Sequence, residues 1–425
     1  MKKIKTKTSA VVLAAMLGIS ALSGCGNKEK ISDTKNTTEQ GGLELDDGFN
    51  PSSDRVKDKT KEIESIINYY YYFDKDAELQ EESYFDGIMA GLDDPYSVYY
   101  TPEEYQQLME DDSGEYVGIG ATVQKNVETN EIRIVKPLKD TPAEKAGLLP
   151  GDRVIKIDDY EITADTELEA AVKMIRGEEG TEVVVTVRRD GETEDREIRI
   201  TRALVKNITV SYEMLQGNIG YIQVDQFIDN TPDQFIEAVD ELTAQGATSL
   251  VFDLRNNPGG LLSAVVKMLD YLIDDNAKVD GADAAGDILY TIDKDDKMID
   301  KYGCSDNHSV DLPMAIIVNE YSASASEVFT SCMRDYGKAT VVGTTSFGKG
   351  IVQTVLPLKD GSAIKITIAK YYTPARAEIH KIGIEPDVKA EVTDEQKKML
   401  KIPHKDDAQL QAAVKALGGA PLTDE

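Results

Sequence analysis

The chain has 425 residues, of which 41% are hydrophobic, enough for more than one buried core, so two or three domains are expected. Acidic residues outnumber basic ones by 77 to 47, and the formal net charge is -30. Such a charge repels phosphate backbones and the anionic face of a membrane, which argues against a nucleic-acid partner.

The first 25 residues have the layout of an export signal. Lysines near the start precede an apolar run from Ala10 to Leu22, which is shorter than the roughly 20 residues that a membrane-spanning helix needs. Leu22-Ser23-Gly24-Cys25 then resembles a bacterial lipobox, which implies lipidation of Cys25. A plain secretory signal with an incidental cysteine is the alternative. Acyl chains would hold the protein on a membrane surface in the bacterial cell envelope, outside the cytoplasm.

Residues 26–55 are polar and lack apolar periodicity, so they are predicted to form a disordered tether. Helical spacing begins after Lys57, at Ile63, Ile66 and Ile67, and a second helical stretch precedes Asp94-Pro95-Tyr96. These stretches predict an N-terminal helical region over residues 56–112. Whether it builds a homodimer stays open at this point.

Residues 113–203 change to short apolar strands around one helical stretch, Glu167 to Ile175, which predicts a small antiparallel domain. Gly118, Ile119 and Gly120 lie in a loop whose two glycines can turn backbone N–H groups toward an anion such as a terminal carboxylate. A protein tail with an apolar last residue would then extend as an added strand beside Ile119 to Val123. Taken alone, the loop is more typical of an ordinary hairpin turn. The stretch from Pro142 to Ile155 resembles the helix-turn-strand signature of PDZ domains in bacterial proteases, which favours tail binding.

Residues 204–392 alternate between strands and helices, a pattern that predicts a parallel-rich α/β core. Residues 393–425 form a polar helical tail, which either docks on the core or stays mobile. Beyond Cys25, the cysteines are Cys304 and Cys332, which are expected to be free thiols.

The chain has three histidines, none in a setting that suggests the general base of a Ser-His-Asp triad. The run Tyr321 to Glu327 follows a buried strand, Met314 to Asn319, and opens a helix. A hydroxyl at such a junction is exposed beside free N–H groups. The alternative is structural, because Ser324-Ala325-Ser326-Glu327 also satisfies the capping-box pattern.

Lys349 lies between Gly348 and Gly350 ahead of a strand, and Gln353 has the same parity on an extended chain. A lysine removes a proton from serine only when it is neutral, so its pKa of about 10.4 must fall toward 7 or 8 through burial, a shift of roughly 3 to 5 kcal/mol. Gln353 can orient the amine by a neutral hydrogen bond.

Together these residues resemble the carboxy-terminal processing peptidases, a family of Ser-Lys proteases with an inserted PDZ domain, over about Asp94 to Asp387. The resemblance implies Ser324 as nucleophile, Lys349 as base and Gln353 as its partner. It also implies an oxyanion hole made by the Ala325 amide and a glycine amide, either Gly259 or Gly260. One departure is Ala375-Arg376-Ala377, where the family usually continues with Ser-Gly-Arg, and it affects substrate contacts there.

The resulting expectation is an α/β core of the crotonase and Clp-protease type, with an inserted β-rich PDZ-like domain and an N-terminal helical region. The expected function is cleavage of exported proteins with apolar C-terminal tails, through an acyl-enzyme and without metal or cofactor. A catalytically silent tail-binding lipoprotein scaffold is the main alternative. Crotonase-like acyl chemistry on thioesters is a third interpretation.

Overall fold

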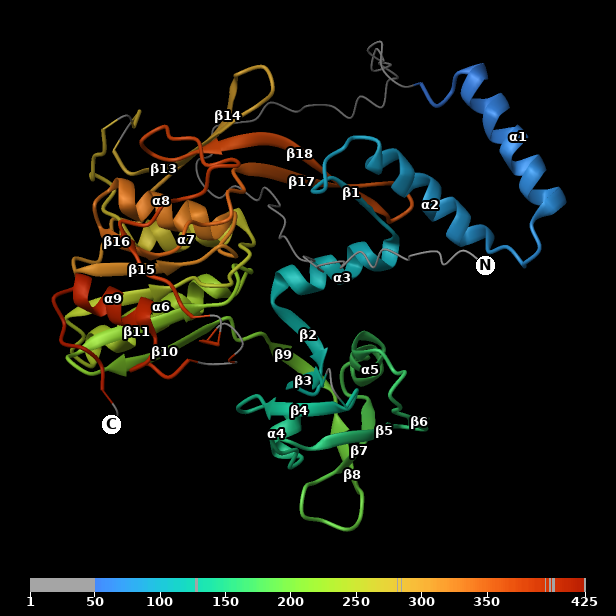
Figure 1. Ribbon diagram of the computed structural model, residues 1–425, viewed down its shortest axis with the longest axis horizontal. Coiled ribbons are helices and arrows are strands. Elements are labelled where there is room, and N and C mark those ends of the chain that lie inside the picture. Colours follow the sequence, from blue (N-terminus) through green and yellow to red (C-terminus); the bar gives the residue numbers. More distant parts are fainter. Residues whose placement is uncertain are drawn as a thin grey trace, which may run out of the picture. The chain divides into compact units, whose positions relative to one another are not determined.

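The computed structural model describes residues 50–126, 129–280, 282–283, 285–393, 395–396, 399 and 402–423. The predicted export signal, its lipidation residue Cys25 and most of the predicted tether lie outside these described residues. The chain divides into two compact units, one ending at Pro95 and the other resuming at Tyr96. The larger unit contains the predicted catalytic and peptide-binding residues (Figure 1).

The N-terminal unit contains two helices, α1 (Asp54–Tyr70) and α2 (Ala77–Ala90). Ser53 and Asp76 cap them, accepting hydrogen bonds from the backbone N–H groups of residues 56 and 79. Within the described chain α1 has no buried residue, and Met89 is the one buried residue of α2. Because so little apolar surface is covered, these helices lack a hydrophobic core of their own.

The inserted domain is joined to the rest of its unit by an antiparallel strand pair, β2 (Glu115–Gly118) and β9 (Ala203–Lys206). Its sheet has the order β3-β4-β5-β7-β8, so β3 is an edge strand. The bounds are β3 (Ala121–Lys125), β4 (Ile132–Pro137), β5 (Arg153–Ile157), β6 (Tyr160–Glu161), β7 (Glu182–Arg188), β8 (Arg196–Thr201), α4 (Pro142–Lys145) and α5 (Leu168–Ile175). Alternate residues of β7 face a core that includes Val183, Val185 and Val187. The antiparallel β-rich insert expected from the sequence is therefore confirmed.

The main sheet has the order β10-β11-β12-β15-β16-β19. Its strands are β10 (Val210–Leu215), β11 (Ile219–Val224), β12 (Ser249–Asp253), β15 (Met314–Val318), β16 (Ala339–Gly343) and β19 (Val388–Lys389). β10 is antiparallel to β11, and every later neighbour pair is parallel. The parallel-rich α/β core is thus confirmed, and the carboxyl ends of β12 and β15 meet at one edge, where ligands bind in such sheets.

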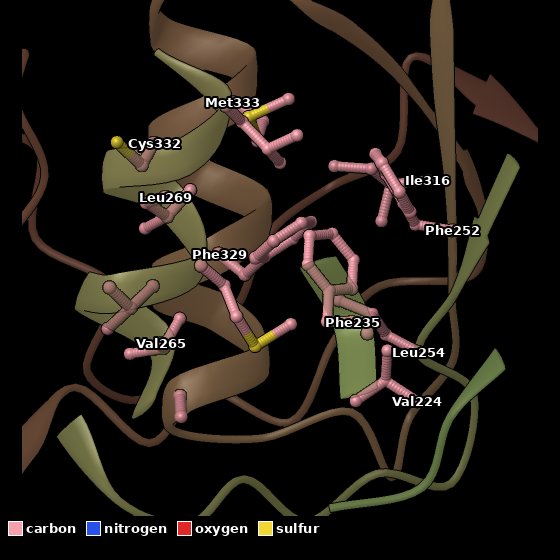
Figure 2. Packing of buried hydrophobic residues seen from close by; sticks show 14 of the residues in the cluster. Val224, Phe235, Phe252, Leu254, Val265, Leu269, Ile316, Phe329, Cys332 and Met333 are labelled. Carbon is pink, nitrogen blue, oxygen red and sulfur yellow. The ribbon is translucent and has the colours of Figure 1, made fainter. Parts of the chain in front are cut away.

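One face of the main sheet is covered by α6 (Thr231–Ala244), α7 (Leu262–Leu272) and α8 (Ala325–Asp335). Figure 2 shows Phe329 of α8 packed beside Phe235 of α6 and Phe252 of β12. The ring of Phe329 lies 5.9 Å from that of Phe235 and 5.5 Å from that of Phe252. These edge-on aromatic contacts fix the position of α8, the helix that begins directly after Ser324.

The opposite face of the main sheet is covered by the described part of the C-terminal tail. Leu410 and Val414 of α9 (Ala408–Ala416) are fully buried against Val251 and Ile317, which alternate with the residues that face α8. Arg255, which follows β12, forms ion pairs with Asp253 and with Asp407 at the start of α9. The helix expected from the sequence therefore docks on the core.

A second sheet holds β1 (Val98–Tyr100), β18 (Ala363–Tyr372), β13 (Asp287–Ile292) and β14 (Met298–Gly303) in that order, and β17 (Ile351–Pro357) also pairs with β18. α3 (Pro102–Ser113) connects β1 to β2.

Cys304 and Cys332 are free, and burial raises the pKa of the Cys304 thiol to about 12. No helix of the described residues has the length and apolar character needed to cross a membrane.

Candidate active site

Ser324 occupies the turn between β15 and α8 in a backbone conformation that few side-chain-bearing residues adopt. Its φ is 55° and its ψ is -114°. Such strain persists only where surrounding contacts hold it, and a sharp strand-to-helix turn presents a serine hydroxyl in the α/β-hydrolase fold. Ser324 is half-buried, whereas Ala325 behind it is buried.

Glu327 is a fully buried carboxylate that joins the Ser324 turn to the loop carrying Lys349. Its Oε2 accepts the backbone N–H of Ser324 at 3.0 Å and of Lys349 at 2.7 Å. Its Oε1 accepts the Ser346 hydroxyl at 2.6 Å and the Gly348 N–H at 2.7 Å. Burial raises the pKa of Glu327, and the four donors oppose that shift. The capping contact expected for Glu327 forms, but it is one of four.

Lys349 is 1% exposed, and its two glycine neighbours allow close approach of the backbone. A Cβ at Gly350 would lie 2.5 Å from the backbone nitrogen of His380. Gly348 has a φ of +89°, and a Cβ there would lie 3.0 Å from the backbone nitrogen of Gly383. The Nζ of Lys349 lies 4.5 Å from the centroid of the Tyr96 ring. Both glycines therefore allow the tight loop around Lys349 that the sequence suggested.

Tyr371 of β18 forms a second link between the two segments. Its hydroxyl lies 2.5 Å from the Lys349 carbonyl oxygen and 3.1 Å from that of Ser324. Burial raises the pKa of Tyr371 well above its usual value, so the hydroxyl keeps its proton and remains a donor. Sequence reasoning missed this role, because the Tyr371-Tyr372-Thr373-Pro374 motif says nothing about which carbonyl oxygens the side chain reaches.

Gln353 lines a small cavity together with Ser324, Ala325 and Gly260. Its Nε2 donates to the Thr367 hydroxyl at 3.3 Å. A register shift between Val352 and Gln353 breaks the simple alternation of β17. The structure therefore brings Gln353 to the Ser324 turn, although not through the unbroken strand that equal parity with Lys349 assumes.

Gly259 and Gly260, the two candidate glycines of the oxyanion hole, differ in their backbone contacts. The N–H of Gly259 donates to the Asn257 side chain at 2.9 Å. A Cβ at Gly259 would lie 2.8 Å from the Ser324 Cβ and 3.0 Å from the Ala325 nitrogen, and one at Gly260 would lie 2.0 Å from the Phe227 carbonyl oxygen. Both positions therefore require glycine, and both lie beside the Ser324 turn.

A separate groove, with a volume of about 370 Å³, runs between β3 and α5 in the inserted domain. Gly118, Ile119 and Gly120, predicted to bind a tail, line it. Its apolar lining residues include Ala121, Val123, Leu138, Val172 and Ile175, and the polar residues Asn207, Thr209, Asp225 and Gln226, outside the inserted domain, line it as well. Gly120 has a φ of +76°, and a Cβ there would lie 2.4 Å from Thr141, so this turn needs glycine.

Arg176, just after α5, also lines the groove and was not predicted from the sequence. Its guanidinium lies 4.8 Å from the Tyr116 ring centroid, and its Nε has no hydrogen-bond partner among the described residues. In the sequence, the one feature that could have pointed to Arg176 is its position directly after the predicted helical stretch Glu167 to Ile175. The groove thus combines an open strand edge and apolar side chains with one cation, Arg176, and one acidic side chain, Asp225. The Arg176 guanidinium also lies 3.9 Å from the Asp111 carboxylate.

Two protein-family models match the chain. A peptidase family S41 model covers residues 218–390, and a PDZ domain model covers residues 116–200. A probable CtpA-like serine protease of Staphylococcus haemolyticus is 41% identical over 340 residues, which cover 79% of this chain and 66% of that protein. One from Staphylococcus epidermidis is 39% identical, covering 80% and 67%. The chain spans about two thirds of the length of these relatives.

Among solved structures, a putative S41 protease from Bacteroides fragilis is 16% identical with a TM-score of 0.50, covering 82% of this chain and 92% of that one. The photosystem II D1 C-terminal processing protease is 28% identical with a TM-score of 0.45, covering 78% and 86%. The Bacteroides fragilis structure supports the fold.

The fold and these similarities define a serine-type peptidase with an inserted PDZ domain. The chain belongs to peptidase family S41, among its CtpA-like serine proteases.

Proposed function

We propose that the protein is an endopeptidase that recognises C-terminal protein tails and cuts peptide bonds with a Ser324–Lys349 pair. One observation carries the proposal: Glu327 accepts the backbone N–H groups of both Ser324 and Lys349. A serine on a strained turn and a fully buried lysine are thereby held on adjacent segments. Neighbouring segments are a precondition for a hydrogen bond between a nucleophile and its base.

In this mechanism the neutral amine of Lys349 takes the proton of the Ser324 hydroxyl while its oxygen attacks the substrate carbonyl carbon. The tetrahedral intermediate collapses, the leaving amine receives the proton from Lys349, and an ester to Ser324 remains. Water, deprotonated by the same amine, then hydrolyses this ester. Gln353, beside Ser324, orients the groups by neutral hydrogen bonds.

The oxyanion of the intermediate is assigned to the amides of Ala325 and Gly260. Because the Gly259 N–H already donates to Asn257, it is the weaker candidate, whereas Gly260 lines the cavity that holds Ser324. Donors fixed where negative charge develops act strongly in a buried site.

Tail recognition is assigned to the groove of the inserted domain. An extended tail adds a strand to the β3 edge, its apolar last side chain enters between Val172 and Ile175, and its carboxylate meets Gly118 to Gly120. Arg176 supplies a charged donor for that carboxylate.

Binding of a tail peptide should weaken about tenfold or more on C-terminal amidation in wild type, and much less in Arg176→Met. Equal affinities of both peptides for wild type would contradict the assignment.

Two further proposals concern placement. Cys25, outside the described residues, is proposed to anchor the protein in the cell envelope, which Cys25→Ala would test by loss of radiolabelled palmitate incorporation.

The N-terminal helices are proposed to pair with a second copy, because Tyr69, Tyr70 and Tyr72 are each more than 75% exposed. Light scattering should report a dimer that serine substitutions at these tyrosines dissociate.

The central experiment compares wild type, Ser324→Ala and Lys349→Ala on one unfolded reporter with an apolar free C-terminus, with products identified by mass spectrometry. We expect cutting by wild type alone, and tail binding by all three. Binding without cutting in wild type, across a panel of tails, would instead support a tail-binding scaffold. A parallel assay for hydrolysis of coenzyme A thioesters tests the third interpretation.

A further inference from the structure

Tyr96 and Ser97, directly before β1, carry no role in the mechanism above, yet they contact its residues. The Tyr96 ring lies beneath the Lys349 Nζ, at 4.5 Å from the centroid. The Ser97 hydroxyl accepts the Thr367 N–H at 3.1 Å, and the Thr367 hydroxyl in turn accepts from the Gln353 amide at 3.3 Å. Two neighbouring residues thus reach Lys349 directly and Gln353 through one intermediate.

We propose that Tyr96 is a positioning residue whose ring face holds the Lys349 side chain and stabilises its ammonium form. The inference rests on the proposed function, in which Lys349 becomes protonated as Ser324 attacks. A cation within about 6 Å of a ring centroid is attracted by the ring quadrupole, most strongly where water is excluded, and the neutral amine is attracted far less. The ring therefore favours the charge that appears on Lys349 in the transition state.

Other groups around Lys349 act on the same charge. Glu327 accepts the Lys349 backbone N–H and has a pKa raised by burial, whereas the Tyr371 hydroxyl contacts the Lys349 carbonyl and remains neutral. Burial opposes the ammonium, because Lys349 is 1% exposed. Replacement of Glu327 or Tyr371 would break a hydrogen bond to the backbone of Lys349, whereas replacement of Tyr96 removes its ring without breaking such a bond.

The chain offers a matched control on β1, the strand that directly follows Tyr96 and Ser97. Tyr100 of β1 lies over Lys365, with 5.3 Å between Nζ and the ring centroid. Lys365 is also buried, and burial lowers its pKa. Tyr100→Leu therefore removes an equivalent tyrosine–lysine contact from the same segment without touching Lys349. A merely structural role of Tyr96 predicts equal effects of the two substitutions.

The first test needs no substrate. The titration of Lys349 is followed by NMR in protein with ¹³C at the lysine Cε, and its signal is assigned by loss in Lys349→Ala. In Tyr96→Leu the midpoint should fall by about 0.4 to 1.5 pH units, since the ammonium loses its ring partner. Tyr96→Phe, which keeps the ring, and Tyr100→Leu should leave the midpoint within about 0.2 units of wild type.

An unchanged midpoint in folded Tyr96→Leu, or an equal shift in Tyr100→Leu, would overturn the proposal. If Tyr96→Leu does not fold, Tyr96→Trp serves instead and should raise the midpoint, because indole binds cations more strongly. In peptide turnover, Tyr96→Leu should lower kcat about tenfold with little change in KM, and should move the acid limb of the pH profile down. Failure of wild type to cut would sink the proposed function, while the NMR midpoints would still decide the role of Tyr96.

Discussion

At the scale of single residues, Glu327 joins the Ser324 turn to the loop that carries Lys349 by accepting four hydrogen bonds. In the sequence, Ser324 and Lys349 stand out through local features, a strand-to-helix junction and paired glycines. In the sequence, Glu327 looks like a simple cap because only one of its four contacts, that with Ser324, is local. Its contacts with Ser346, Gly348 and Lys349 depend on how α8 packs, which no spacing along the chain encodes.

Glu327→Gln should lower kcat strongly while leaving KM less affected. Each oxygen of Glu327 accepts two donors, so an amide NH₂ in place of one oxygen would face two N–H or O–H groups that it cannot satisfy. Such a loss costs about 1 to 3 kcal/mol for each buried group. We expect a fall in kcat of about 10- to 1,000-fold and a lower melting temperature.

The pH dependence of stability provides an independent measurement on the same variant. Because burial raises the pKa of Glu327, the folded state holds this proton more tightly than the unfolded chain does. The contribution to stability is full below the usual pKa of 4.5 and is lost as pH rises through the raised value. Urea unfolding should show this loss in wild type but not in Glu327→Gln. Identical slopes in both proteins would contradict a raised pKa of Glu327.

At the scale of elements, periodicity and strand–helix alternation were sufficient to predict the β-rich insert and the parallel sheet. They left the tail undecided, because α9 looks polar until the sheet face that it covers is known. Leu410 and Val414 are apolar and lie at helical spacing. The surface that they cover, which includes Val251 and Ile317 of the main sheet, is known only from the structure. The bulge at Gln353 was likewise invisible, since alternation alone predicts an unbroken strand.

Asp407→Asn should destabilise the core by about 1 to 3 kcal/mol, because it leaves the largely buried guanidinium of Arg255 with one carboxylate, Asp253, and the neutral Gln409 oxygen. The control is Asp311→Asn, which removes an ion pair with Lys338 at 2.9 Å in which the acidic side chain is exposed. That change should cost under about 1 kcal/mol. Chemical denaturation of both variants gives the comparison, and equal effects would mean that docking of α9 does not depend on the Arg255 network.

At the scale of the whole molecule, two strands join the tail-binding groove to the proposed catalytic core. β2 and β9 leave the core side by side, and the Asn230 amide donates to the Gly114 carbonyl next to β2. The cavity at Ser324 is small, with a volume of about 30 Å³. A movement of the inserted domain would act on the core through this strand pair.

If tail binding drives that movement, a tail peptide added in trans should accelerate cleavage of a short reporter that has no free C-terminus. A ligand shifts a conformational equilibrium only when it binds one state better, so the acceleration should saturate at the affinity of the groove for the tail. Val172→Trp fills the groove between β3 and α5 without touching the Ser324 cavity, and should abolish the acceleration while leaving the basal rate unchanged. Initial rates with rising tail peptide distinguish the cases. Inhibition in wild type would mean that the tail competes for the catalytic cavity, and no response would mean that the groove delivers substrate without controlling the site.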